Sequence, residues 1–361
     1  MIRRALIWLG RLTVGLLLFG FIVLFTLLLL LQNKEVKSFA AKRVTAHLSR
    51  RWGAELYIGS LEGNLYSHFC LRKAAIVFHS DTLLSVARLE TSYRLESLLR
   101  KRLFLDSLSI DTPKVRLLRN EKGEPLLITL FKPQPESIPK SPSIEGGTGK
   151  PFTLFLDRLI LRNGHFEPAG GPDWVPQQID SIHIDAQLQV GRGYRIALNR
   201  ARFSTQHPNL QINNLRFKLQ SDSAGMELRD FELRTAENCF FASAAAQKPL
   251  LTDGHFTLQT DSLNAQELHL RLPTLRIPGR PSLSLNGSLK EQIFQTDLAV
   301  SSDQSLLRLQ GSVHPFPAFF TDSLVERRFS LQARVQKLQI TDWLASFHGP
   351  SEISGEIEAT G

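Results

Sequence analysis

The chain has 361 residues, two cysteines and a formal net charge of +9. The basic excess is local, because residues 1 to 51 hold nine Lys or Arg against the single acidic residue Glu35 and so carry +8 of the total. The rest of the chain is almost neutral, which argues against a nucleic-acid-binding surface along the body of the protein. A basic cluster beside an apolar segment instead favours contact with anionic lipid headgroups.

An uncharged and almost wholly apolar segment of 20 residues runs from Leu12 to Leu31. At about 1.5 Å per residue this segment is long enough to cross a bilayer. It is also longer than the apolar region of about 7–15 residues that is typical of a cleaved signal peptide. We therefore expect residues 1–33 to form a membrane anchor. Basic residues lie on both sides of the segment, so charge by itself does not set the orientation.

Residues 34–53 are expected to form a juxtamembrane amphipathic helix that ends at Gly53. Its apolar residues recur at helical spacing, and Trp52 is a candidate interfacial aromatic. The apolar positions are Val36, Phe39, Ala40, Val44 and Leu48. The alternative is that this helix caps the end of the domain that follows, and the two roles are compatible.

One spacing of apolar residues, apolar-x-apolar-x-x-apolar-x-apolar, recurs along the rest of the chain. Alternation with period two predicts a β-strand. The step of three predicts a β-bulge, which returns the apolar residues to one face, or else a tight turn between two short strands. The pattern occurs at Leu103, Leu105, Leu108 and Ile110; at Leu154, Leu156, Leu159 and Leu161; at Leu210, Ile212, Leu215 and Phe217; at Met226, Leu228, Phe231 and Leu233; and at Leu270, Leu272, Leu275 and Ile277.

The fold class that we predict is mainly β: an N-terminal transmembrane helix, then an elongated curled sheet, a β-groove, with an apolar interior and a few short helices. Its first segment is residues 54–132, with a short helix at 92–101 and turns at Gly59 and Gly63. A Pro- and Gly-rich loop follows at 133–151, and residues 152–361 continue the groove, with a turn at Gly287 between Leu285 and Leu289 and helical breaks at 262–268 and 341–347. About 25 strands at about 4.8 Å each would make it on the order of 100 Å long.

The sequence contains no HExxH, GxSxG or CxxC motif, and we expect neither an enzyme nor a cofactor. Gly146 to Lys150 resemble a phosphate-binding loop only in part, because Ile144 and Pro151 replace residues that such a loop requires. His183 and His269 lie in strand-like segments, where a solvated position is more common than a metal ligand. For Cys70 and Cys239 we favour two buried thiols over a disulfide.

Several stretches resemble the AsmA-like superfamily and, within it, the TamB-type proteins. They are the anchor followed by residues 56–63, the pair of stretches 83–90 and 103–115, and the strand-Gly-strand rhythm at 279–287 and 306–311. The resemblance implies an N-terminal portion of such a protein, anchored in the bacterial inner membrane with residues 1 to about 11 in the cytoplasm and the bulk in the periplasm. TamB-type proteins are much longer and end in a C-terminal domain that this sequence does not contain.

The resemblance further implies a bridge that carries phospholipid along the groove towards the outer membrane, supports outer-membrane biogenesis and works with an Omp85-type partner. An alternative is an envelope scaffold that binds that partner by β-edge pairing and carries no lipid. The candidate groove-lining residues are Leu103, Leu105, Leu108, Ile110, Leu154, Leu156, Leu159, Leu161, Leu210, Ile212, Leu215, Phe217, Leu270, Leu272, Leu275, Ile277, Leu307 and Leu309. The same residues would form an ordinary core if two sheets packed face to face.

Overall fold

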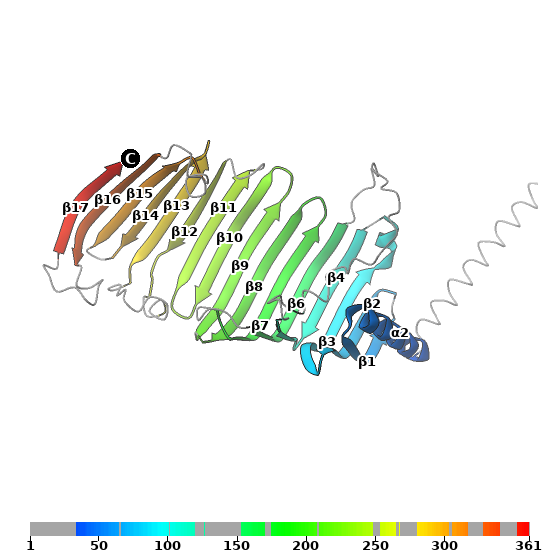
Figure 1. Ribbon diagram of the computed structural model, residues 1–361. Helices are drawn as coiled ribbons and strands as arrows, with labels where there is room; N and C mark the ends of the chain where they lie inside the picture. The colour runs from blue at the N-terminus through cyan, green and yellow to red at the C-terminus, as the bar shows by residue number, and fades with distance from the viewer. Residues whose placement is uncertain are drawn as a thin grey trace, which may run out of the picture.

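A computed structural model describes most of the chain after residue 33 (Figure 1). The described residues are 34–64, 66–100, 102–119, 126, 153–169, 175–207, 209–247, 253–264, 267, 280–302, 305–316, 328–339 and 352–360. The predicted anchor at 1–33, the loop at 133–151 and the helical break at 341–347 lie outside them. No helix in this described part is long and apolar enough to cross a membrane.

The described part is mainly β and contains one long helix, one short 3₁₀ helix and 17 strands. The helices are α2 (Lys34–Trp52) and η1 (Leu95–Arg100). The strands are β1 (Glu55–Gly63), β2 (His68–Phe78), β3 (Asp81–Arg94), β4 (Arg102–Asp111), β5 (Lys114–Arg116), β6 (Thr153–Glu167), β7 (Gln178–Val190), β8 (Tyr194–Gln206), β9 (Leu210–Ser221), β10 (Gly225–Thr235), β11 (Cys239–Gln247), β12 (Asp253–Thr260), β13 (Ser282–Lys290), β14 (Ile293–Ser301), β15 (Leu306–His314), β16 (Arg328–Gln339) and β17 (Glu352–Thr360).

All 17 strands belong to one extended sheet, in which nearly every strand pairs antiparallel with the strands before and after it in the chain. The exception is at β4 and β6, which pair parallel, while the short β5 pairs with β3 and β6. Figure 1 shows the strands side by side in a single row, from β1 beside α2 to β17 at the C-terminal end. The described strands therefore do not form the two-sheet sandwich that was the alternative.

The step of three is a β-bulge and not a turn at the described positions. Residues 103–110, 154–161, 210–217 and 226–233 each lie within one continuous strand. The pairing register shifts between Leu156 and Leu159 and between Leu228 and Phe231. Each shift adds one unpaired residue to a strand and restores the apolar residues to their original face. The fifth copy, at 270–277, lies outside the described residues.

Three local predictions need correction. The helix predicted at 92–101 begins only at Leu95, because Ser92 and Tyr93 still pair with β4. Gly59 makes no turn and lies within β1, where a Cβ would be 3.0 Å from the carbonyl oxygen of Arg72. Gly287 was also taken as a turn residue but lies within β13. In all three places ladder hydrogen bonds with a neighbouring strand outweigh the local preference.

The helix predicted after residue 33 is present as α2 and ends at Trp52, followed by Gly53 at φ +62°. A left-handed residue just past the last turn is a common way to end a helix, and glycine adopts it without strain. The Ser49 hydroxyl then accepts a 2.9 Å hydrogen bond from the Leu56 N–H of β1. Helix α2 is thereby joined to the first strand of the sheet.

Candidate apolar ligand-binding face

The strand register gathers the apolar residues of the sheet into rows that cross many strands. Residues directly opposite each other in a ladder point to the same face, so an unbroken series of pairs defines a row. The longest such row begins at Tyr93 of β3 and reaches Ala359 of β17. Its members are Tyr93, Leu105, Leu156, Leu188, Ile196, Leu219, Leu228, Ala244, Phe256, Gly287, Thr296, Gly311, Leu331 and Ala359.

Two further rows flank the first on the same face. One contains Leu108, Leu159, Ala186, Leu198 and Phe217 and resumes at Phe231, Ala242, Leu258, Leu285, Leu298, Leu309, Ala333 and Ile357. The other contains Ile110, Leu161, Ile184, Ala201, Leu215 and Leu233. We call the side of the sheet that carries these rows the apolar face.

Every described residue among the predicted groove-lining set lies on the apolar face. Leu103 pairs with Leu154, Ile212 pairs with Phe203, and Leu307 pairs with Val300. Leu210 pairs with Thr205 at the end of the same ladder. Leu270, Leu272, Leu275 and Ile277 lie outside the described residues. Sequence reasoning therefore brings together residues that the sheet does place on one side.

The apolar face is only partly covered. Leu156 and Ile212 are 6% and 4% exposed, whereas Leu331 is 47% and Ile357 is 69% exposed. Most of the other members of the three rows are half-buried. In a closed core these side chains would be buried almost throughout, so a large apolar area here remains open to a ligand.

A hollow of about 570 Å³ lies on the apolar face over β9 to β14. Side chains that line it include Met226, Leu228, Phe256, Phe294 and Phe316. The rings of Phe294 and Phe316 stack at 5.0 Å, and those of Phe256 and Phe294 are 6.3 Å apart, which makes an aromatic wall on one side. Its volume is in the usual range for sites that take small ligands, and its lining is almost wholly carbon.

Sequence reasoning missed this aromatic wall and the alanines of β11. Ala242, Ala244 and Ala246 point to the apolar face between larger residues of β10 and β12. The alternation of Gly254, Phe256 and Leu258 was a usable signal for the wall. Alanine and glycine are only weakly hydrophobic, so the sequence pattern did not indicate that their positions belong to the apolar face.

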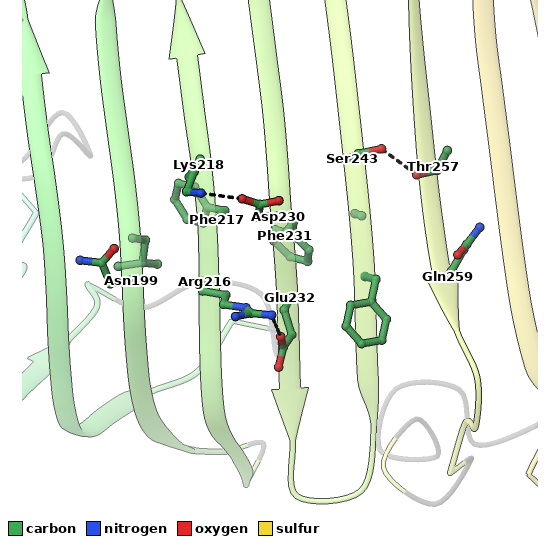
Figure 2. A pocket seen from close by; sticks show the side chains of 13 residues that line it. Asn199, Arg216, Phe217, Lys218, Asp230, Phe231, Glu232, Ser243, Thr257 and Gln259 are labelled. Carbon is green, nitrogen blue, oxygen red and sulfur yellow. Dashed lines mark hydrogen bonds and ion pairs between the residues drawn. The ribbon is translucent and has the colours of Figure 1, made fainter.

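The opposite side of the sheet is polar, and many of its charges are paired between neighbouring strands. Figure 2 shows two such pairs, Arg216 with Glu232 at 2.5 Å and Lys218 with Asp230 at 2.8 Å, beside a hollow of about 650 Å³. The hydrogen bond from Lys218 lowers the pKa of the Asp230 carboxyl. Exposed pairs contribute little stability each, but together they keep this face hydrated.

A histidine cluster lies on the polar face where β5 meets β6. The Nδ1 of His165 is 2.5 Å from Asp180 and its Nε2 is 2.9 Å from Glu167. The bond to Glu167 is the main cause of a raised His165 pKa, and the bond from His165 is the main cause of a lowered Glu167 pKa. Arg116 also donates to Glu167 at 2.5 Å. The cluster joins β5, β6 and β7.

The described residues contain no group of three or more His, Cys, Asp or Glu arranged to hold a metal ion. His183 projects from the polar face, where burial and nearby arginines lower its pKa, and His269 lies outside the described residues. Cys70 and Cys239 are both free thiols, the first buried and the second half-buried. What the described part offers a ligand is therefore an extended apolar surface.

Comparisons with family models, curated proteins and solved structures found no match to this chain.

Proposed function

We propose that this protein is anchored in the bacterial inner membrane and carries phospholipids along the apolar face towards the outer membrane. The observation that supports the proposal is the set of apolar rows on this face. The row from Tyr93 to Ala359 is apolar except at Gly287, Thr296 and Gly311, and on those strands the flanking row supplies Leu285, Leu298 and Leu309. The periplasmic location and the direction of transport come from the sequence resemblance and from the apolar segment at 12–31.

The energetics explain why such a surface suits lipid transfer. A phospholipid has roughly 30 methylenes, and each costs about 0.8 kcal/mol to expose to water, so free passage would cost on the order of 20 kcal/mol or more. A sheet that stays apolar from strand to strand lowers this barrier at every step. The headgroup needs no buried polar partner, because it stays in water beside the open sheet. We infer that the bulges curl the sheet into a trough around the acyl chains.

The dimensions also fit a bridge. Strands in a sheet are spaced by about 4.8 Å, so the sheet formed by the described strands from β1 to β17 is on the order of 70 Å long. The strands run across the long axis of the sheet, so a lipid that moves along that axis passes from one strand to the next. Strands β4, β6 and β10 each present four apolar side chains to it.

Photo-crosslinking from matched positions on one strand tests the proposal. Leu309 points to the apolar face and its neighbour Gln310 to the polar face of β15. The second matched pair is Leu215 and Arg216 of β9. A photo-reactive residue at Leu309 or Leu215 should give phospholipid adducts in intact cells, and one at Gln310 or Arg216 should give few. Equal adducts from both faces, or none from the apolar face, would reject lipid carriage.

A second candidate function is that of an envelope scaffold, favoured by the edge of β17. Among the described strands β17 pairs only with β16, and its residues from Ser354 to Thr360 are exposed. An unpaired edge accepts a strand from another protein. The partner that the resemblance implies is an Omp85-type outer-membrane protein.

Proline substitution separates the two functions. Adjacent backbone N–H groups point to opposite edges of a strand. One of the two substitutions Glu356→Pro and Ile357→Pro therefore removes a donor from the outer edge of β17, and the other removes a donor to β16. If the scaffold is correct, the outward proline should abolish partner binding while lipid adducts at Leu309 persist. Loss of the adducts with normal partner binding would favour the conduit.

A further inference from the structure

Helix α2 presents two different sides, and the structure assigns them differently from the apolar spacing in the sequence. Thr45, Leu48 and Trp52 are half-buried and lie on the side that faces β1, together with Ser49, which is bonded to Leu56. Phe39 lies on the other side and is 68% exposed. The predicted apolar stripe is therefore divided, and Trp52 is not the aromatic that faces outward.

The outward side of α2 is basic. At 100° per residue Lys42, Arg43 and Arg50 fall within about 60° of Phe39 on the helix surface, and all three are exposed. Glu35, in the first turn, is the one acidic residue of the helix; it is exposed and also falls within about 60° of Phe39, so three cations outnumber one carboxylate on this side. We call Phe39, Lys42, Arg43 and Arg50 the outward face.

Several arginines of the sheet have an acidic partner, whereas these three cations of α2 have none among the described residues. Arg94, Arg162 and Arg308 of the sheet each pair with an aspartate on a neighbouring strand. Within the described residues, none of Lys42, Arg43 and Arg50 forms an ion pair, and Arg50 only donates to the carbonyl of Ala46 in its own helix. A cationic surface with an exposed phenyl ring at its centre is complementary to anionic headgroups above an apolar layer.

We propose that the outward face of α2 binds the anionic surface of a phospholipid bilayer and holds the first strand of the sheet next to that surface. The inference rests on the membrane location assigned under the proposed function, and it adds a docking surface and its lipid class. The Phe39 ring enters the interface between headgroups and acyl chains, and the three cations contact phosphates. Because Ser49 is bonded to Leu56 and only Gly53 and Ala54 separate α2 from β1, docking of the helix also places the β1 end of the sheet at the membrane.

A fluorescent probe at position 39 in the full chain tests the docking. Phe39→Cys would be labelled with an environment-sensitive fluorophore in a Cys239→Ser background, since Cys70 is 3% exposed and can stay. The protein would be placed in nanodiscs of phosphatidylcholine alone or with about one-third phosphatidylglycerol. We expect a blue-shifted emission in the anionic discs only. We also expect a return towards the aqueous spectrum when salt is raised to about 0.5 M, because salt screens exposed charges.

Neutralising the outward face supplies the decisive variant. Lys42→Gln, Arg43→Gln and Arg50→Gln keep the helix-forming tendency, and each should lower the ratio of docked to free α2 about fivefold. The matched control neutralises three exposed arginines of β8, by Arg195→Gln, Arg200→Gln and Arg202→Gln, and should leave the spectrum unchanged. An unchanged far-ultraviolet circular dichroism spectrum would show that the sheet still folds in both variants.

Emission that is the same in neutral and anionic discs, or that survives the triple neutralisation of α2, would overturn the proposal. The result is separable from that of lipid carriage. Docking of α2 without lipid adducts at Leu309 would reject the conduit alone, and adducts without docking would reject this inference alone.

Discussion

The two halves of the sheet differ in how their strands pair. Between β6 and β11 every pairing contains a register shift, whereas between β11 and β16 the pairings contain none. The burial of the apolar face changes with them. Leu156, Ala186, Ala201 and Ile212 in the bulged half are at most 7% exposed, and each lies next to a register shift.

In the regular half Leu331 is 47% exposed but Val300 is 8% exposed, and in the bulged half Met226 is 44% exposed. A bulge bends its strand and increases the local twist, which brings neighbouring side chains on the inner face closer together. A regular ladder twists only gently. The buried residues beside the register shifts indicate that bulges, and not only hydrophobicity, affect how deeply the apolar face is enclosed. We therefore expect the bulged half to hold an apolar ligand more tightly than the regular half.

The largest expected effect comes from deleting one residue in a regular strand. Deletion of Gln310 would place Leu307 and Leu309 on the opposite side of β15 from Val313, because side chains alternate strictly in this strand. Exposure of two leucines costs about 4 kcal/mol in local stability. Native-state hydrogen exchange of β14 to β16 measures it.

The matched deletion in the bulged half should be milder. Removal of Asp157 turns the spacing from Leu154 to Leu161 into strict alternation, so all four leucines stay on one face and only the bulge is lost. We expect a loss of about 1–3 kcal/mol, mainly through increased exposure of Leu156. Equal losses for the two deletions would contradict the account of the bulges given above.

Truncation of one leucine in each half is the next largest effect. Leu156→Ala removes a buried side chain and should cost about 2–4 kcal/mol, whereas Leu331→Ala removes a half-exposed one and should cost less than about 1 kcal/mol. Hydrogen exchange in the surrounding strands measures each loss of stability locally, because stability can differ from one region of an elongated sheet to another. Similar values would mean that the apolar face is equally enclosed along its length.

Two glycines, one in the regular half and one in β17, provide a finer comparison. A Cβ on Gly287 would overlap the ring of Phe256, whereas a Cβ on Gly355 of β17 would meet nothing within 4 Å. Gly287→Ala should therefore cost about 1–3 kcal/mol and Gly355→Ala close to nothing. Adding Phe256→Ala to Gly287→Ala should remove most of the interaction penalty, which a double-mutant cycle measures. An additive cycle would show that the two residues do not meet.

The smallest expected effect is the pH dependence of the bulged half at His165. Because the pKa of His165 is raised in the folded state, the stability from its two carboxylate bonds is complete below the unfolded pKa and falls as pH rises through the folded pKa. The lowered pKa values of Glu167 and Asp180 add a second loss as pH falls through their folded values. We expect less than about 1 kcal/mol for each loss, since the pairs are partly exposed.

Hydrogen exchange of β5 to β7 between pH 6 and 9 checks the basic side of this prediction. His165→Asn should remove the dependence on pH there and leave that of β13 to β15 unaltered. If the pH dependence of hydrogen exchange persists in His165→Asn, another titratable group causes it.

The strands and their faces could be predicted from the local residue pattern. Strict alternation and the step of three are local properties of the chain, since side chains alternate with period two and a bulge restores the phase. This is why Leu105 and Leu156, and also Leu215 and Leu309, could be assigned to one side before any pairing was known. The apolar character of the face follows from the same local pattern.

Which strands meet, and which side of α2 faces outward, depend on the tertiary structure. The parallel pairing of β4 with β6 depends on contacts far apart in the sequence. So does the tight approach of Phe256 to Gly287, which local preference alone placed in a turn. The turn between β13 and β14 has positive φ at Glu291 and Gln292, a conformation that their residue types do not announce. The side of α2 that faces outward was likewise fixed only by the packing of the helix against β1, because helical spacing shows a stripe but not what covers it.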